Sequence, residues 1–248
     1  KTFINKKFSL SELDITTRTI EIKNLISFIR SIKDSPQIYI LEKFVKKGYL
    51  IADINLKFDQ KGNIKDDFII KGFIKDGEVK PLKKINLSKI NLIFNLQNNK
   101  FEFKDINLSY DNNDLNFPEL NIKKQKNKFL VSGKNNSKNL VLDNKKINQL
   151  LNIDFSNLKI KSAEFDLSNT FSFKIDNKYK IDDFKIDSLM NLKNSKVVSS
   201  KNLKEFFPEL NDIIELSDHQ IEIEYKENFL SITGNGNILI QKEKDNIK

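Results

Sequence analysis

The fold of this chain is indicated most clearly by the stretch INLSKINLIFNLQNNKFEFKDINLSY, residues 85–110. Within it, apolar residues recur at intervals of two, three and two, first as Ile85, Leu87, Ile90 and Leu92 and again as Phe101, Phe103, Ile106 and Leu108. Residues two apart share one face of an extended strand, so the intervals of two predict half-buried β-strands. The interval of three breaks the alternation once in each copy. The stretch therefore predicts two strands with one irregularity each, joined by a polar turn at residues 97–99.

The same spacing recurs along the chain. At 38% hydrophobic content, chance gives about 0.7 strict copies, whereas six strict copies are present without overlap. The further strict copies are Phe8, Leu10, Leu13, Ile15; Leu115, Phe117, Leu120, Ile122; Leu158, Ile160, Ala163, Phe165; and Tyr179, Ile181, Phe184, Ile186. A looser seventh copy is Tyr49, Ile51, Ile54, Leu56, with Leu50 and Ala52 between its members.

A strand can contain an interval of three in two ways. Either a β-bulge inserts one residue and keeps all four side chains on one face, or a tight turn separates two very short strands. Pairs such as Ser88-Lys89 and Lys104-Asp105 lack the Asn-Gly or Asp-Gly sequence of two-residue hairpins, which favours the bulge. Pro118 within another interval also fits, because proline in a sheet needs an edge or a bulge. Repeated bulges predict a curved sheet.

Such a sheet has one face of Ile, Leu, Phe and Tyr and another of Lys, Asn, Asp, Ser and Glu. A second sheet or helices could cover the apolar face and form a sandwich core. An open apolar face instead marks a binding surface, and a groove many strands long would suit an acyl chain. The predicted groove-lining residues are Ile85, Leu87, Ile90, Leu92, Phe101, Phe103, Ile106, Leu108, Leu115, Phe117, Leu120, Ile122, Tyr179, Ile181, Phe184 and Ile186.

The expected fold class is mainly β: a long antiparallel meander forming a curved, groove-like sheet with a few short helices. Helical patterns cover residues 24–33, residues 144–151 and residues 200–216. A further helix is expected to have Ser35 as N-cap, Pro36 in its first turn and Gly48 at its C-terminal end. We expect a single fragment of a longer protein: strands plus two helices over 1–48, the β-meander over 49–190, and a helix plus a closing hairpin with its turn at residues 226–228 over 191–248.

The composition argues against several classes of function. The chain has 248 residues and a net charge of +9, but its lysines are spread along the polar strand positions. Aromatic residues lie on the opposite, apolar face, an arrangement that does not suit single-stranded nucleic acid, so we expect no nucleic-acid partner.

Residues for catalysis or metal binding are scarce. There is no Cys and one His, His219, which argues against thiolate zinc sites and His-based triads. The carboxylates of Asp66-Asp67 and Asp182-Asp183 point to opposite strand faces, and no glycine-rich phosphate loop is present. We expect no catalytic residue, no metal site, no cofactor and no enzymatic activity.

Five segments carry recognisable sequence patterns: YLIADINLKFDQKGNI at 49–64, IIKGFIKDG at 69–77, FLVSG at 129–133, LKEFFPEL at 203–210 and SITGNGNI at 231–238. These segments resemble the AsmA-like family of bacterial envelope proteins, most closely the central regions of its large YhdP-like and TamB-like members. The low glycine content and the absence of Trp depart from that family.

This resemblance implies a protein anchored in the inner membrane, through a segment outside this chain, and spanning the periplasm. It implies a β-groove that carries phospholipid between the inner and outer membranes, with acyl chains as partners and envelope proteins as further candidate partners. A structural or assembly β-repeat with a closed core, in outer-membrane protein assembly or adhesion, is the alternative.

Overall fold

The structure is a computed structural model that describes residues 11–32, 36–63, 65, 67–82, 85–143, 159–176, 178, 180–199, 204–205, 208, 212–240 and 243–247. These residues are mainly β-structure, as the sequence predicted. The helices are α1 (Ile22–Ile32) and α2 (Pro36–Phe44). The strands are β1 (Glu12–Thr16), β2 (Ile20–Glu21), β3 (Val45–Lys57), β4 (Ile69–Leu82), β5 (Ile85–Gln97), β6 (Lys100–Tyr110), β7 (Asn113–Gln125), β8 (Lys128–Leu142), β9 (Lys159–Asp176), β10 (Ile181–Val198), β11 (Ile213–Lys226), β12 (Phe229–Ile240) and β13 (Glu243–Ile247).

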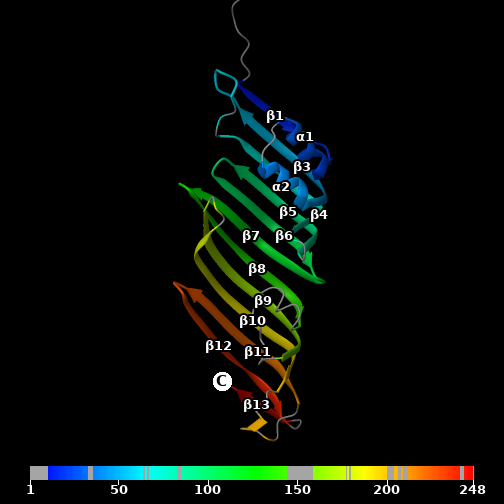
Figure 1. Ribbon diagram of the computed structural model, residues 1–248, viewed down its shortest axis with the longest axis vertical. Helices are drawn as coiled ribbons and strands as arrows, with labels where there is room; N and C mark the ends of the chain where they lie inside the picture. The colour runs from blue at the N-terminus through cyan, green and yellow to red at the C-terminus, as the bar shows by residue number, and fades with distance from the viewer. Residues whose placement is uncertain are drawn as a thin grey trace, which may run out of the picture. The chain divides into compact units, whose positions relative to one another are not determined.

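The strands form an antiparallel meander. Their hydrogen-bonded order is β1, then β3 through β13 in sequence order (Figure 1). The short strand β2 lies off this path and pairs with β3. Two-residue turns join several of the successive strands; Asp111 and Asn112, between β6 and β7, both have positive φ. This conformation matches the twist of antiparallel strands and suits Asn and Asp. The predicted meander is confirmed.

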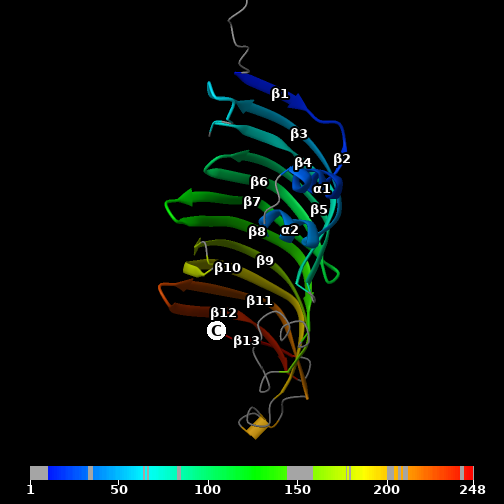
Figure 2. The same cartoon turned by 45° about the horizontal axis from the view of Figure 1, so that its top comes forward.

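The chain divides into two compact units. Unit 1 contains residues 1–112, 117–131 and 175–179, and unit 2 contains residues 113–116, 132–174 and 180–248. In unit 1, β3 to β6 are visibly bent along their length (Figure 2). In unit 2, the buried residues Leu140, Ala163, Phe165 and Leu192 form the core cluster.

Both predicted N-terminal helices are present, but one ends earlier than expected. Helix α2 ends at Phe44, and Gly48 lies inside β3 with a φ of 137° rather than at a helix end. Val45 is buried and pairs with Val79 of β4, so strand pairing begins where the sequence pattern favoured further helix. The expected N-cap, Ser35, lies outside the described residues.

The C-terminal third differs most from prediction. Residues 213–216 belong to β11, not to the helix predicted over 200–216, because Ile214 is buried and pairs with Val197 of β10. The run Ile213, Ile214, Leu216 fits a helical period and a strand period alike, and the tertiary pairing decides between them. The helix predicted at 144–151 lies outside the described residues.

Candidate functional site

Neighbouring strands of unit 1 align their apolar residues in rows. Ala52 of β3, Gly72 of β4, Phe94 of β5 and Phe103 of β6 oppose one another in turn, which places them on the same face of the sheet. Parallel rows lie two residues to either side. We call this set the unit 1 apolar face: Leu50, Ala52, Ile54, Ile70, Gly72, Ile74, Leu92, Phe94, Leu96, Phe101 and Phe103.

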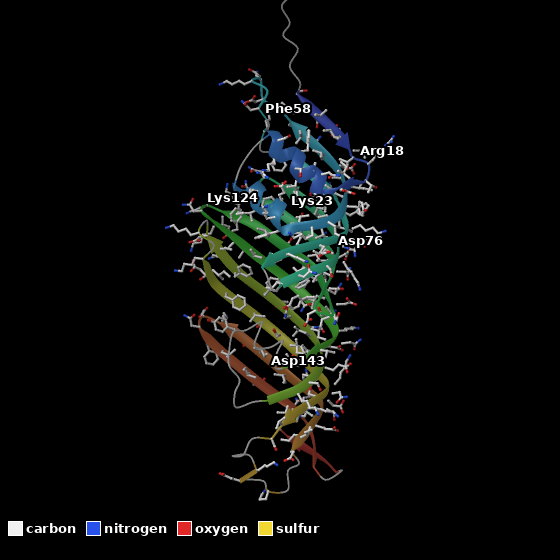
Figure 3. The ribbon with its side chains drawn as sticks, turned by 45° about the vertical axis from the view of Figure 1, so that its right-hand side comes forward. Arg18, Lys23, Phe58, Asp76, Lys124 and Asp143 are labelled. Carbon is white, nitrogen blue, oxygen red and sulfur yellow. The ribbon has the colours of Figure 1, made fainter. Side chains whose placement is uncertain are left out.

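β-Bulges extend this face along the strands. Lys89 of β5 and Asp105 of β6 have φ of 51° and 50°, and the strand register shifts at both positions. In β4, Asp76 has a φ of 52° and another register shift follows Ile74; the Asp76 side chain is labelled in Figure 3. Each extra residue restores the parity that an interval of three breaks. The predicted bulges at Ser88-Lys89 and Lys104-Asp105 are confirmed.

Asparagine side chains support these bulges. The Asn91 amide donates to the carbonyl oxygen of Lys89 at 2.9 Å, and its own oxygen accepts the backbone N–H of Asp76 at 3.1 Å. The Asn107 amide donates in the same way to the carbonyl oxygen of Asp105 at 3.1 Å. In both strands the asparagine lies two residues after the residue with positive φ. A side chain thus satisfies backbone groups that the irregular ladder leaves without a strand partner.

The looser seventh copy of the spacing contains no bulge. β3 pairs with β4 in unbroken register from Tyr49 to Asn55. Simple alternation therefore places Leu50 and Ile54 on the apolar face, and Tyr49 and Ile51 on the opposite face. Leu50 and Ala52, which lie between the members of this copy, therefore share the apolar face with Ile54.

The unit 1 apolar face is only partly covered. Of its side chains, Ala52 and Phe94 are buried at 2% and 6% exposure, and the others with a side chain are half-buried. Helices α1 and α2 lie beside β3 and β4 at one end of the strands (Figure 1). There the Ile22 side chain of α1 comes within 3.0 Å of where a β-carbon on Gly48 would lie, so the missing side chain makes room for the helix. Among the described residues of unit 1, no second sheet covers the rest of the face.

The opposite face of unit 1 is mainly polar. Asp53, Lys71, Asn95 and Glu102 form one of its rows. The Glu102 carboxylate accepts hydrogen bonds from Lys100 at 2.7 Å and Asn95 at 2.9 Å, and the Lys100 contact holds the pKa of Glu102 below its usual range. The strands of unit 1 are therefore amphipathic, with one apolar face and one face that is mainly polar but also carries the row Ile51, Phe73 and Ile93.

Unit 2 carries an apolar face of its own. Leu115, Leu142, Leu167, Met190 and Ile221 pack against its core cluster. In the same unit, aromatic rings follow one another across three strands: Phe173 of β9 and Phe184 of β10 have ring centroids 6.4 Å apart, and Phe184 and Tyr225 of β11 have centroids 5.8 Å apart. These tilted contacts fall within the favourable range for aromatic pairs. Phe184 remains 40% exposed, so the aromatic row is open to solvent.

A second network of side-chain contacts surrounds a residue with positive φ in unit 2. Asn139 of β8 has a φ of 54°, and its N–H donates to the carboxylate of Asp166 in β9 at 2.8 Å. Lys193 of β10 contacts the same carboxylate at 2.7 Å and the Asn139 side-chain oxygen at 2.6 Å. The Lys193 contact and then the Asn139 N–H hold the pKa of Asp166 below its usual range.

The predicted lining residues lie in several environments. Ile106 is buried, Ile181 and Phe184 are 55% and 40% exposed, and Tyr179 lies outside the described residues. The remaining ones are half-buried: Ile85, Leu87, Ile90, Leu92, Phe101, Phe103, Leu108, Leu115, Phe117, Leu120, Ile122 and Ile186. In unit 1, pairing brings the β5 and β6 residues onto one face. In unit 2, Leu115 joins the core cluster and Phe184 the aromatic row.

The spacing template missed other residues of these faces. Phe94 and Leu96 continue the β5 alternation beyond Leu92, so following the period further along the strand finds them. Phe173 and Tyr225 belong to stretches whose apolar residues alternate without an interval of three. Their contact with Phe184 depends on strand register, which the sequence pattern does not contain.

Other kinds of site find little support in the described parts of the chain. No cluster of three potential metal ligands occurs among the described residues. His219 lies in β11 beside the bulge residue Asp218, and its Nδ1 is 3.0 Å from the carbonyl oxygen of Ser217. Its ring rests on Gly236, where an added β-carbon would come within 2.2 Å of it. None of the helices formed by the described residues is long and apolar enough to cross a membrane.

Comparison with known proteins gives no relative: no protein-family model, no curated protein and no solved structure matches the chain.

Proposed function

We propose that the apolar faces of this protein bind the acyl chains of phospholipids. The observation that carries the proposal is the unit 1 apolar face, an unbroken apolar surface over four strands whose side chains are mostly half-buried. Burying apolar surface yields about 25 cal/mol per Å², or about 0.8 kcal/mol for each methylene group of a bound chain. A partly open apolar face of this extent normally marks a binding surface.

The geometry suits an elongated ligand. The rows run across the strands, and the bulges keep Leu87 of β5 and Leu108 of β6 on the same side as Phe94 and Phe103, so apolar contacts continue along each strand. The opposite face stays hydrated through groups such as Glu102. A flexible chain can contact such a surface at many points while its polar headgroup remains in water.

The resemblance to AsmA-like proteins supports a more specific role. We place the chain in the periplasm, as a segment of an inner-membrane-anchored bridge that carries phospholipid to or from the outer membrane. Cell fractionation of the full-length protein, with detection in periplasmic and inner-membrane fractions, tests the location. Recovery of the protein in the cytosol alone would contradict it.

Site-specific photo-crosslinking tests acyl-chain binding. A benzophenone amino acid at Phe103, on the apolar face, is expected to capture co-purifying phospholipid, detected by mass spectrometry of the intact adduct. The matched control is Ile93, which is 49% exposed, lies in the neighbouring strand and points to the opposite face. Adducts at Phe103 and not at Ile93 support binding. Equal labelling, or purified protein free of lipid, supports the closed-core structural module instead.

Lipid transfer is a separate question from lipid binding. A fluorescence assay between donor and acceptor vesicles measures whether the chain accelerates phospholipid exchange. A Leu92→Glu variant places a charge on the apolar face and should lower both bound lipid and transfer rate, whereas Ile93→Glu should change neither. If the chain binds lipid but does not accelerate exchange, it is a lipid-binding module, and the proposed role as a phospholipid carrier is wrong.

A further inference from the structure

The outer edge of β12 is exposed along residues 229–235. β13 pairs only with residues 236–240 of β12, and no other described strand pairs with this edge. Phe229, Leu230 and Ile232 are 69%, 55% and 61% exposed. The segment contains no charged residue and no proline, the usual protections of a free strand edge. By contrast, the edge strand β1 carries Glu12 and Asp14.

The turn geometry tells which backbone groups face outward. Glu227 and Asn228 form a two-residue turn with φ of 54° and 64°, and Lys226 pairs with Phe229. In such a hairpin the pair that closes the turn exchanges two hydrogen bonds, and hydrogen-bonded pairs alternate from there. Phe229, Ser231 and Thr233 therefore bond to β11. The N–H and C=O groups of Leu230, Ile232 and Gly234 point away from it.

We infer that this edge pairs with the same edge of a second copy of the chain, antiparallel, with Ile232 on the two-fold axis. In this register Ile232 opposes its own counterpart, Leu230 opposes Gly234, and Ser231 opposes Thr233. The outward-facing groups form hydrogen-bonded pairs. On one face of the joined sheet the large side chain of Leu230 lies opposite Gly234. On the other face the hydroxyls of Ser231 and Thr233 lie opposite each other.

Gly234 supplies independent support. A β-carbon added there would make only ordinary contacts, 3.5 Å to the carbonyl oxygen of Gln220 and 3.7 Å to the Ile221 side chain. Packing within the chain thus leaves room for a side chain at this position, unlike at Gly236, where the His219 ring lies in the way. The proposed register fills that room with Leu230 of the second copy.

The pairing is expected to be weak. One short strand on each copy buries far less than the roughly 800 Å² per partner of a standard interface. Each chain also carries a net charge of +9, and the two copies repel one another at low salt. We expect a dissociation constant of about 10 to 100 µM and tighter association at higher ionic strength, where charge repulsion is screened.

Cysteine crosslinking tests the register, because the chain has no native cysteine. With Ile232→Cys, the two thiols face each other across a Cα separation of about 5.5 Å, which a disulfide can span. Mild oxidation should give a covalent dimer. Leu230→Cys is the matched control: it lies on the same edge and face, but its counterpart is about 14 Å away along the strand, so little dimer should form.

Sedimentation velocity across about 1 to 200 µM gives the second measurement. The native chain should associate increasingly with concentration, and Gly234→Val should weaken association without lowering the thermal stability of the monomer. Equal crosslinking of both cysteine variants would overturn the register. Two results would overturn the proposal itself. One is absence of dimer in a folded Ile232→Cys protein. The other is failure of the reduced thiol in that variant to react with a small maleimide at about 1 µM protein, where the chain is expected to be monomeric, because the edge would then already be covered within one chain.

Discussion

Replacing Lys89 with glycine tests whether the bulge in β5 holds a residue in an unfavourable backbone conformation. Lys89 is exposed and has a φ of 51°, so its side chain contributes little and its backbone conformation dominates the effect. Left-handed geometry costs an L-residue about 1–2 kcal/mol, and glycine avoids this cost. Glycine also makes the unfolded chain more flexible, which lowers the free energy of unfolding by about 0.5–1 kcal/mol. The net expectation for Lys89→Gly is a gain of about 0.5 kcal/mol in the free energy of unfolding.

The matched control is Lys71 of β4, which is also exposed but lies in a regular stretch, opposite Asn95. There glycine should lower the free energy of unfolding by about 0.5–1 kcal/mol. Glycine increases the flexibility of the unfolded chain equally at both sites. The difference between the two changes in the free energy of unfolding therefore measures the cost of the left-handed conformation at Lys89, about 1–2 kcal/mol. Valine should show the reverse order: destabilising at Lys89, where a β-branched residue is forced to positive φ, and neutral or stabilising at Lys71.

Urea unfolding measures these differences, with far-UV circular dichroism and tyrosine fluorescence as two probes. If the two probes give the same unfolding transition and the variants keep the denaturant slope of the native protein, their urea midpoints can be compared directly. The reasoning fails if glycine shifts both sites in the same direction, because the bulge would then impose no left-handed conformation in solution.

Three further outcomes follow from the packing and charges. Gly72→Ala should lower the free energy of unfolding by about 1–3 kcal/mol, because the new β-carbon would lie 2.1 Å from the Ile51 carbonyl oxygen and 2.8 Å from the Phe94 ring; urea midpoints measure it. Phe94→Ala should cost about 3 kcal/mol, and in a double-mutant cycle Gly72→Ala should cost less in that background, so strict additivity would argue against the ring contact. Asp166→Asn should destabilise the protein at pH 7. The lowered pKa of Asp166 means that its carboxylate stabilises the fold above its unfolded pKa, and that this contribution disappears as the pH falls through the lower folded value. A pH series should therefore show the two proteins converging below about pH 4, and a constant gap would contradict the role of Lys193.

Local sequence carries much of the architecture of unit 1. The alternation in β5 and β6 predicted both strands, and the intervals of three predicted their bulges, because side-chain parity leaves few other ways to keep Leu87 and Leu92 on one face. The pairs Ser88-Lys89 and Lys104-Asp105 also argued against a two-residue hairpin by their turn chemistry. These inferences need only the geometry of a single strand.

The same spacing template failed where both faces of a strand carry apolar residues. β3 offers Tyr49 and Ile51 as well as Leu50 and Ala52, and only its pairing with β4 decides which set joins the unit 1 apolar face. At residues 213–216 the apolar pattern fits a helix and a strand equally, and the pairing of Ile214 with Val197 decides for the strand. Short-range pattern cannot settle either choice, since the energy that decides it lies in contacts with a distant strand.

Alternation along each strand was enough to predict an antiparallel β-meander with one apolar face and bulged strands, because both properties belong to single strands and their turns. Three features depend instead on the folded chain: the lack of a covering sheet over the unit 1 apolar face within the described residues, the contacts among the aromatic rings of unit 2, and the free edge at residues 229–235 of β12. Each of these is set by which strands become neighbours and in what register, and a chain's own periodicity does not specify its partners.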